Sequence, residues 1–302
     1  EEADMGRSIG VVMTNNITAG LIENHQLIGE LRRYPEDPDE LHGLIDLPTD
    51  QLVEVICDLI IALKPEKDAL DAIGIALPGI VRAGVVEDSP NLGQLKGAKI
   101  SQKVDAVLQA RGLHAPIALF NDADASAAGF AATRNQLDKV VRVWTLGNGI
   151  GFGRYPDADG PFEGGHTVVT LDPKETFCGC GGVGHLEGIM GHRAMRLRFM
   201  DMEPDEIFAN AKQGDQRCAD FVKRWHRALA AGTATSIHLE GPGRFYLTGL
   251  NISFLDINLV KQYLWDMVKM SPLQSYTLES VPETPGIAVI GAGTAAELEQ
   301  KR

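Results

Sequence analysis

The sequence predicts an α/β fold with a mixed β-sheet. Three short strands with tight turns open the chain at residues 8–34, and helix and strand patterns then alternate to the C-terminus. A unit of strand, glycine turn and helix recurs, although no repeat is visible at the level of single residues. Alternating helices and strands are typical of a sheet covered by helices. The 302 residues suffice for two packed domains or one large domain.

The first 63 residues predict a β-meander followed by a helix. The three strands are SIGVVMT, TAGLIEN and QLIGELRRY, and a turn-rich acidic loop follows at 34–50. In residues 51–63 the apolar side chains share one helical face. We expect Asp50 to cap this helix, because a carboxylate accepts hydrogen bonds from the free amides of a first turn.

Buried strands and helices alternate through the rest of the chain. Short apolar runs that end in glycine or proline are typical of buried strands, and longer segments with a 3.6-residue period are typical of helices. The expected elements are, in order, strand AIGIALPG, helix 101–111, strand PIALF, a helix starting at NDADASAAGFAAT, strand 140–146, a mostly helical stretch over 186–238 with Met190, Met195, Leu197, Phe199 and Met200 in the core, strand RFYLTGLN, helix 257–271, and a strand, glycine turn and closing helix over 286–300.

Composition and charge argue against several classes of protein. The net charge is −13, and a chain this acidic is a poor match for nucleic acid or for an anionic membrane. No run approaches ~20 apolar residues, the length of a membrane span. The N-terminus EEADMGRS lacks the basic and then apolar order of a signal peptide, and four cysteines do not make a disulfide scaffold. We therefore expect a cytoplasmic protein that binds neither nucleic acid nor membrane.

Residues 163–188, EGGHTVVTLDPKETFCGCGGVGHLEG, collect histidines, cysteines and glutamates among glycines. Four of them follow the spacing H-x11-C-x-C-x4-H, namely His166, Cys178, Cys180 and His185. Zinc favours four tetrahedral nitrogen or sulfur donors, and glycines let the backbone wrap tightly around an ion. The spacing predicts a structural Zn²⁺ site that holds nearby carboxylates in place. The alternative is two free thiols in a glycine-rich turn, with surface histidines.

Residues 145–187 resemble the ROK family of bacterial sugar kinases and sugar-responsive repressors. The composite motif of that family appears here as LGNGIGFG, FEGGH and CGCGGVGHLE, and LPG, PNL and FNDADASAA precede it in the family's order. The family usually has a third cysteine where His185 stands, and imidazole is also a good zinc donor. The resemblance covers most of residues 73–190. It implies the actin-like, ribonuclease H-like two-domain fold of ATPases and sugar kinases, with mixed sheets.

The resemblance also implies a division of the chain. A small N-terminal α/β domain would span residues 1–121 and be completed by a C-terminal helix at 290–302. A large α/β domain would span residues 122–289 and carry the zinc-binding loop. Members of the family are commonly homo-oligomers, and we expect a dimer.

A hexose site follows from the same resemblance. Hexose hydroxyls both donate and accept hydrogen bonds, so carboxylates and amides suit them. Asp122 is expected to be the general base, because it follows a buried strand and leads a helix, near the positive helix end; the alternative is that Asp122 and Asp124 only cap that helix. His166 would contact both zinc and sugar. The implied sugar-binding residues are Gly79, Asn91, Asn121, Asp122, Glu163, His166 and Glu187.

The nucleotide half departs from the family pattern. The first strand of the family ends in Asp-x-Gly-Gly-Thr-Lys, and this chain has Val11-Val12-Met13-Thr14-Asn15-Asn16, without the aspartate that helps to hold Mg²⁺. GNGIGFG at 147–153 would offer consecutive backbone amides to phosphate oxygens. Gly249 and Gly291–Gly293 resemble the turns that border adenosine. The implied ATP-binding residues are Thr14, Asn15, Gly147, Asn148, Gly149, Gly151 and Gly249.

Three functions remain open at this point. The first is a hexose kinase that uses ATP and Mg²⁺, with Asp122 as base. The second is a sugar-acting enzyme that needs no ATP, such as a glycosidase, since Asp122, Glu163 and Glu187 would supply paired carboxylates. The third is a sugar-binding homologue without catalysis. The altered first-strand motif motivates the last two, and the sequence does not rank one sugar over another.

Overall fold

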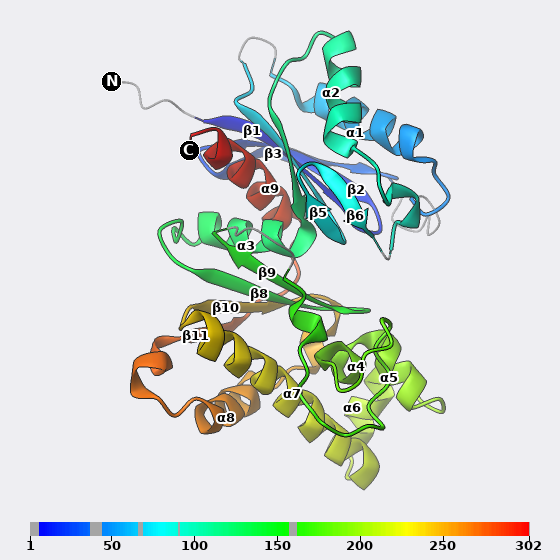
Figure 1. The fold of residues 1–302 in the computed structure, drawn as a ribbon, viewed down its shortest axis with the longest axis vertical. Helices are drawn as coiled ribbons and strands as arrows, with labels where there is room; N and C mark the ends of the chain where they lie inside the picture. Colours follow the sequence, from blue (N-terminus) through cyan, green and yellow to red (C-terminus); the bar gives the residue numbers. More distant parts are fainter. Residues whose placement is uncertain (1–5, 37–43, 66–68, 90, 157–161, 302) are drawn as a thin grey trace. The chain divides into compact units, whose positions relative to one another are not determined.

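The computed structural model describes residues 6–36, 44–65, 69–89, 91–156 and 162–301. Pro90 of the PNL motif and residues 37–43 of the acidic loop lie outside these ranges. The chain forms two compact units, drawn in Figure 1. The first unit contains Glu1–Val141, Gly153–Pro161 and Thr284–Arg302, and the second contains Arg142–Phe152 and Phe162–Glu283. The domain boundary expected after residue 121 stays a prediction.

A five-stranded sheet in the order β3-β2-β1-β4-β7 forms the centre of the first unit. The first three strands are antiparallel neighbours, and β4 and β7 continue the sheet in parallel to β1. The predicted opening meander is therefore confirmed. The strands are β1 (Arg7–Met13), β2 (Ile17–Glu23), β3 (Gln26–Tyr34), β4 (Ala72–Leu77) and β7 (Ile117–Asn121), with a separate hairpin of β5 (Ile80–Arg82) and β6 (Val85–Asp88).

Helices cover both faces of this sheet (Figure 1). Alternate side chains of β1 point to opposite faces: Val11 packs in the core with α1 and α2, and Val12 packs on the side of α9. The helices are α1 (Thr49–Leu63) and α2 (Ile100–Ala110) on one face, and α3 (Asp122–Thr133) and α9 (Pro285–Gln300) on the other, with the short 3-10 helix η1 (Gly93–Leu95) before α2. The prediction that Asp50 caps α1 was wrong: Pro48 is the N-cap of this helix, and Asp50 lies in its first turn.

The predicted strand and glycine turn near the C-terminus are instead part of the continuous helix α9. Glycine serves close packing here. A Cβ atom on Gly291 would lie 1.7 Å from the carbonyl oxygen of Ala125 in α3, and one on Gly10 of β1 would lie 1.9 Å from that of Val289. Without side chains at these positions, backbones approach each other directly. No turn for adenosine exists at Gly291–Gly293, so that expectation was wrong.

A four-stranded sheet in the order β11-β10-β8-β9 forms the centre of the second unit, with β10 and β11 parallel. Its apolar core surrounds Trp144 and Trp225, both almost fully buried. The elements are β8 (Val141–Leu146), β9 (Ile150–Tyr155), η2 (Gly164–His166), α4 (Leu186–Met190), α5 (His192–Arg198), α6 (Pro204–Lys212), α7 (Gln216–Glu240), β10 (Arg244–Thr248), η3 (Leu250–Phe254), α8 (Ile257–Met267), η4 (Ser271–Ser275) and β11 (Thr277–Ser280).

The predicted helical stretch over 186–238 is confirmed, with two errors in its core. Met190, Met195 and Phe199 are buried as expected, whereas Leu197 is 47% exposed and Met200 is 90% exposed. Leu197 lies in the last turn of α5, and Met200 lies two residues beyond the end of this helix at Arg198. Among the described residues, no helix combines the length and the hydropathy that crossing a bilayer requires.

The packing of α9 gives a matched pair of substitutions. Gly291→Ala should lower the free energy of unfolding by about 3 kcal/mol, because its methyl group would overlap the Ala125 carbonyl. Gly286→Ala in the same helix meets only side-chain atoms 3.9 Å or more away, and should be neutral or stabilise by up to about 1 kcal/mol through helix propensity. Chemical denaturation measures both. Equal stability of the two variants would contradict this account of α9.

Candidate metal and sugar site

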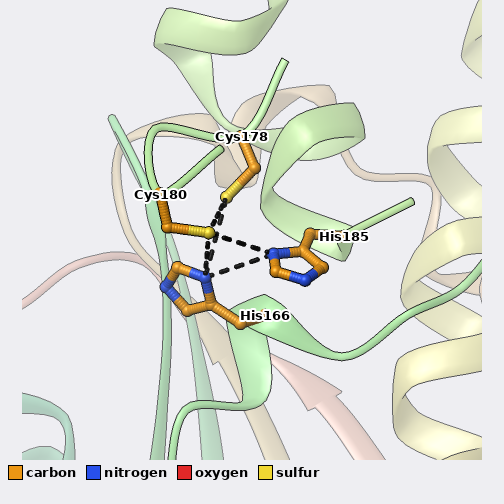
Figure 2. Close-up of side chains that lie close together, drawn as sticks. All are labelled: His166, Cys178, Cys180 and His185. Carbon is orange, nitrogen blue, oxygen red and sulfur yellow. Dashed lines mark hydrogen bonds between the residues drawn. The ribbon is translucent and has the colours of Figure 1, made fainter. Parts of the chain in front are cut away.

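Four side chains from separate parts of the loop after β9 converge at one point, as Figure 2 shows. They are the residues of the H-x11-C-x-C-x4-H spacing, and their ligand atoms all lie within 4.8 Å of one another. His166 Nδ1 lies 3.1 Å from Cys180 Sγ and 3.3 Å from His185 Nδ1. Cys178 Sγ lies 3.4 Å from Cys180 Sγ and 3.7 Å from His166 Nδ1. The predicted convergence is confirmed.

These distances fit a tetrahedral zinc ion. Zinc bonds of about 2.0–2.3 Å to nitrogen and sulfur place the donors of one tetrahedron roughly 3.3–3.8 Å apart. Burial, followed by the neighbouring His166, lowers the pKa of His185, so its ring is neutral at pH 7 and can offer a lone pair. In the absence of a metal ion, burial raises the pKa of the Cys178 thiol to about 12. Zinc binding would therefore release the Cys178 proton.

An ion pair anchors the loop that carries these ligands. Glu175 is 4% exposed and binds both Arg198, at the end of α5, and Arg224 of α7. Its carbonyl oxygen accepts a hydrogen bond from Gly184 N–H at 2.8 Å, next to the ligand His185. Arg198 also stacks over the ring of Phe177 at 4.2 Å, beside the ligand Cys178, and donates to the Gly188 carbonyl in α4. We call this arrangement of Glu175, Arg198 and Arg224 the loop clamp. Sequence reasoning missed it, because the partners are 23 and 49 residues apart.

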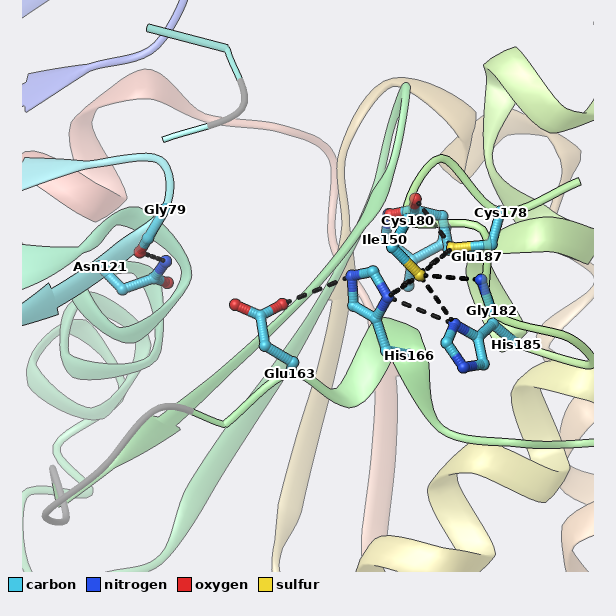
Figure 3. Close-up of polar contacts among 10 residues, drawn as sticks. All are labelled: Gly79, Asn121, Ile150, Glu163, His166, Cys178, Cys180, Gly182, His185 and Glu187. Carbon is cyan, nitrogen blue, oxygen red and sulfur yellow. Dashed lines mark hydrogen bonds and ion pairs between the residues drawn. The ribbon is translucent and has the colours of Figure 1, made fainter. Parts of the chain in front are cut away.

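The predicted sugar ligands of the second unit lie beside the metal ligands (Figure 3). Glu163 Oε2 lies 3.7 Å from His166 Nε2, the ring nitrogen that faces away from the cysteines. Glu187, in the first turn of α4, accepts a hydrogen bond from Ile150 N–H at 3.1 Å, and its other carboxylate oxygen lies 3.5 Å from Cys178 Sγ. The structure therefore brings Glu163, His166 and Glu187 together, and Glu187 connects the metal cluster to the start of β9.

The glycine-rich segment predicted to bind phosphate is shorter than expected. Only Gly147–Gly149 form a turn, in which Gly147 N–H donates to the Gly149 carbonyl at 3.0 Å. Gly151 belongs to strand β9, and its assigned role in phosphate binding stays a prediction. Gly249 begins the turn after β10 with φ of 107°, and a Cβ atom there would lie 2.7 Å from the Leu146 carbonyl. It therefore packs against the end of β8.

Asn121, Asp122 and Gly79 lie together in the first unit, at the junction of β7 and α3. Asn121 is the N-cap of α3: its Oδ1 accepts from Ala123 N–H and Asp124 N–H, and its Nδ2 donates to the Gly79 carbonyl at 2.9 Å, as drawn in Figure 3. The cap is therefore neither of the two aspartates that we weighed for that role. Asp122 is half-buried at the first position of the helix, and its Oδ1 accepts from Ala123 N–H at 3.0 Å.

The remaining predicted residues of the first unit are exposed. Asn91 lies just before η1 with an exposed side chain. Thr14 and Asn15 form the turn between β1 and β2, and Thr14 N–H already donates to the Asn16 carbonyl at 2.9 Å. Val11, at the position of the family aspartate, is fully buried. These contacts leave the assigned roles of Asn91, Thr14 and Asn15 as predictions.

The comparisons with known proteins agree with the geometry. The model of the ROK family matches residues 15–277. A glucokinase of Pyrobaculum calidifontis is 29% identical over 187 residues, which are 57% of this chain and 60% of that protein. An N-acetylmannosamine kinase of Salmonella paratyphi A is 28% identical over 71% of this chain and 72% of its own. The crystal structure of a ROK hexokinase from Thermus thermophilus matches 98% of this chain and 99% of its own, with a TM-score of 0.78 and 22% identity. This likeness confirms the predicted actin-like α/β fold.

The four-ligand cluster predicts metal binding that depends on its cysteines. The wild-type protein should purify with about one zinc per chain, and Cys180→Ser should lower zinc affinity more than about 100-fold, beyond what changes around a metal site usually cost. Cys180 is exposed, so this change should leave the fold intact. Cys218→Ala, at a buried thiol outside the cluster, should keep its zinc. Elemental analysis by mass spectrometry measures both, and a metal-free wild-type protein would contradict the assignment.

The loop clamp predicts a second effect on metal affinity. Glu175→Gln should weaken zinc binding about tenfold, because the half-buried Arg198 loses its charged partner and the loop loses its anchor. Arg224→Gln is the matched control, since that side chain is 52% exposed and its pairing should contribute little. Competition with a chelating dye gives both affinities. Equal zinc affinity in wild type and Glu175→Gln would show that the loop holds its shape without the clamp.

Proposed function

The chain belongs to the ROK family, and from this we propose that it is a sugar kinase that transfers the γ-phosphate of ATP to a hexose hydroxyl. The observation that carries the proposal is the family match over residues 15–277, together with relatives that are a glucokinase and an N-acetylmannosamine kinase. The residues of each unit support the assignment in different ways.

Asp122 supports the proposed kinase activity, because it is placed to act as the general base. The first position of α3 places its carboxylate at the positive end of the helix dipole. As the sugar hydroxyl oxygen bonds to the γ-phosphorus, a carboxylate oxygen of Asp122 would take the hydroxyl proton, and the bond to the ADP oxygen would break. The hydrogen bond from Ala123 N–H to Oδ1 would hold the carboxylate in one orientation.

Amide, carboxylate and imidazole side chains supply the proposed sugar contacts. Asn121 has both lone-pair directions of Oδ1 engaged by the helix, so we assign it a donor role through its remaining Nδ2–H. In the second unit, Glu163 and His166 Nε2 face each other and suit a hydroxyl that donates to one and accepts from the other. Asn91 and Glu187 complete the proposed set. A structural zinc ion on the four-ligand cluster would fix His166 and Glu187 relative to each other.

The nucleotide would bind at the turn Gly147–Gly149. The residues at the end of β1 do not fit Mg²⁺, which prefers carboxylate ligands: Val11 is buried, and Thr14 and Asn15 carry no charge. We therefore assign no step of the reaction to a cation held by β1. This same observation favours the second candidate function, an enzyme or sugar-binding protein that acts on sugars without ATP.

Calorimetry separates the two candidates. A non-hydrolysable ATP analogue is titrated into the protein with and without glucose or N-acetylmannosamine, and ADP release is followed in a coupled assay. Nucleotide binding with sugar-dependent ADP release supports the kinase. Sugar binding with no response to nucleotide would contradict it, and cleavage of a nitrophenyl glycoside would then identify a hydrolase.

Substitution of the proposed base tests the mechanism. Asp122→Asn should lower kcat roughly 100- to 10,000-fold, because the amide cannot accept the hydroxyl proton. Zinc content should not change. Asp124→Asn is the matched control, because its remaining Oδ1 still accepts from Arg154 N–H, so activity should stay near the wild-type value. Full activity in Asp122→Asn would remove this residue from the mechanism.

A further inference from the structure

The turn Gly147–Gly149 is held by its carbonyl oxygens. The Gly147 carbonyl accepts from His192 N–H at 2.9 Å and from Asn251 Nδ2 at 3.0 Å. The Asn148 carbonyl accepts from Arg193 N–H at 3.4 Å. Two amides at the start of α5 and one side chain of η3 thus bind one face of the turn.

Fixing the carbonyls fixes the amides. A trans peptide is planar, and its C=O and N–H groups point in opposite directions. The Gly147 carbonyl shares its peptide with Asn148 N–H, and the Asn148 carbonyl shares its peptide with Gly149 N–H. Both N–H groups therefore point away from α5 and η3, and within the described part of the chain neither has an acceptor. Adjacent unpaired amides of this kind suit phosphate oxygens.

Asn251 is the side chain that completes this arrangement. It is fully buried, and a buried amide group needs partners for both its oxygen and its nitrogen. Its Oδ1 lies 3.0 Å from His192 Nδ1, and its Nδ2 donates to Gly147. Because Oδ1 accepts and Nδ2 donates, His192 must carry its proton on Nδ1. Each partner sets the orientation of the next, from His192 through Asn251 to Gly147.

We propose that His192 and Asn251 form a latch that positions the amides of Asn148 and Gly149 for the phosphates of the nucleotide. They are positioning residues, since they act through the carbonyls of the turn and need not touch the nucleotide. The proposal rests on the assignment of ATP as the phosphoryl donor. The sequence analysis assigned no role to His192 or Asn251, and the separation of 59 residues between them explains why.

The test compares His192→Ala, His192→Asn and Asn251→Ala with wild type. His192 is half-buried, so its variants should fold even if Asn251→Ala does not. An asparagine at position 192 can place an amide N–H near the position of Nδ1, so it should restore the contact. Ser253→Ala, at an exposed neighbour in η3, is the matched control. Two quantities are measured: hydrogen exchange at the turn amides Gly147 and Ile150, which have acceptors, and KM for ATP and for the sugar.

The latch predicts a specific combination of results. His192→Ala should speed exchange at Gly147 and raise KM for ATP about tenfold, the effect of one lost hydrogen bond of about 1.4 kcal/mol. kcat, zinc content and KM for the sugar should stay near wild type, and His192→Asn should recover most of the loss. Unchanged exchange, or faster exchange with unchanged KM for ATP, would overturn the proposal.

Failure of the kinase assignment is a distinct outcome. If wild type shows no ATP turnover, inorganic pyrophosphate is titrated into wild type and His192→Ala by calorimetry. Weaker pyrophosphate binding in the variant supports a latch that orients the amides for phosphate. In that case the latch stands and only the kinase assignment fails. Equal binding, or no binding by either protein, overturns it.

Discussion

The convergence of His166, Cys178, Cys180 and His185 joins distant parts of the loop between β9 and α4. Between Thr167 and Val183 only Glu175 and Cys178 are buried, so the segment has almost no apolar core of its own. Hydrophobic burial, the main driving force of folding, contributes little there. Polar contacts therefore order the segment. The four clustered side chains and the backbone hydrogen bonds between 167–169 and 184–186 hold the loop to itself, and the loop clamp holds it to α5 and α7.

Order in this loop extends to the rest of the candidate site through Glu187. This carboxylate contacts Cys178 on one side and the amide of Ile150 on the other, so the metal cluster and the glycine turn share one side chain. The latch holds the same turn from its other end. A change at the four clustered side chains should thus reach the turn through Glu187, whereas a change in the latch should leave those four side chains undisturbed.

The first unit shows why the altered strand motif is compatible with a normal fold. Val11 lies among Ile9 and Met13 in the core with α1 and α2, where an unpaired carboxylate would be costly to bury. The opposite face of the sheet meets α9 at glycines, which let the backbones of sheet and helix touch. Valine in place of the family's aspartate at position 11 is therefore compatible with the same architecture, although the end of β1 then lacks a charge. The role proposed for Asp122 depends on the β7–α3 junction, where α3 begins.

The sequence by itself determined the alternation of helices and strands, the opening meander and the four cysteine and histidine side chains that converge, because short-range periodicity and spacing carry these features. It also placed Asp122 at the start of a helix. Tertiary structure decided what depends on contacts between distant segments. The glycines of α9 serve packing against Ala125 and Gly10 and not a turn, a distinction that local composition does not contain. In the same way, Asn251 and Glu175 acquire their roles from partners many residues away, which only the folded chain brings within hydrogen-bonding distance.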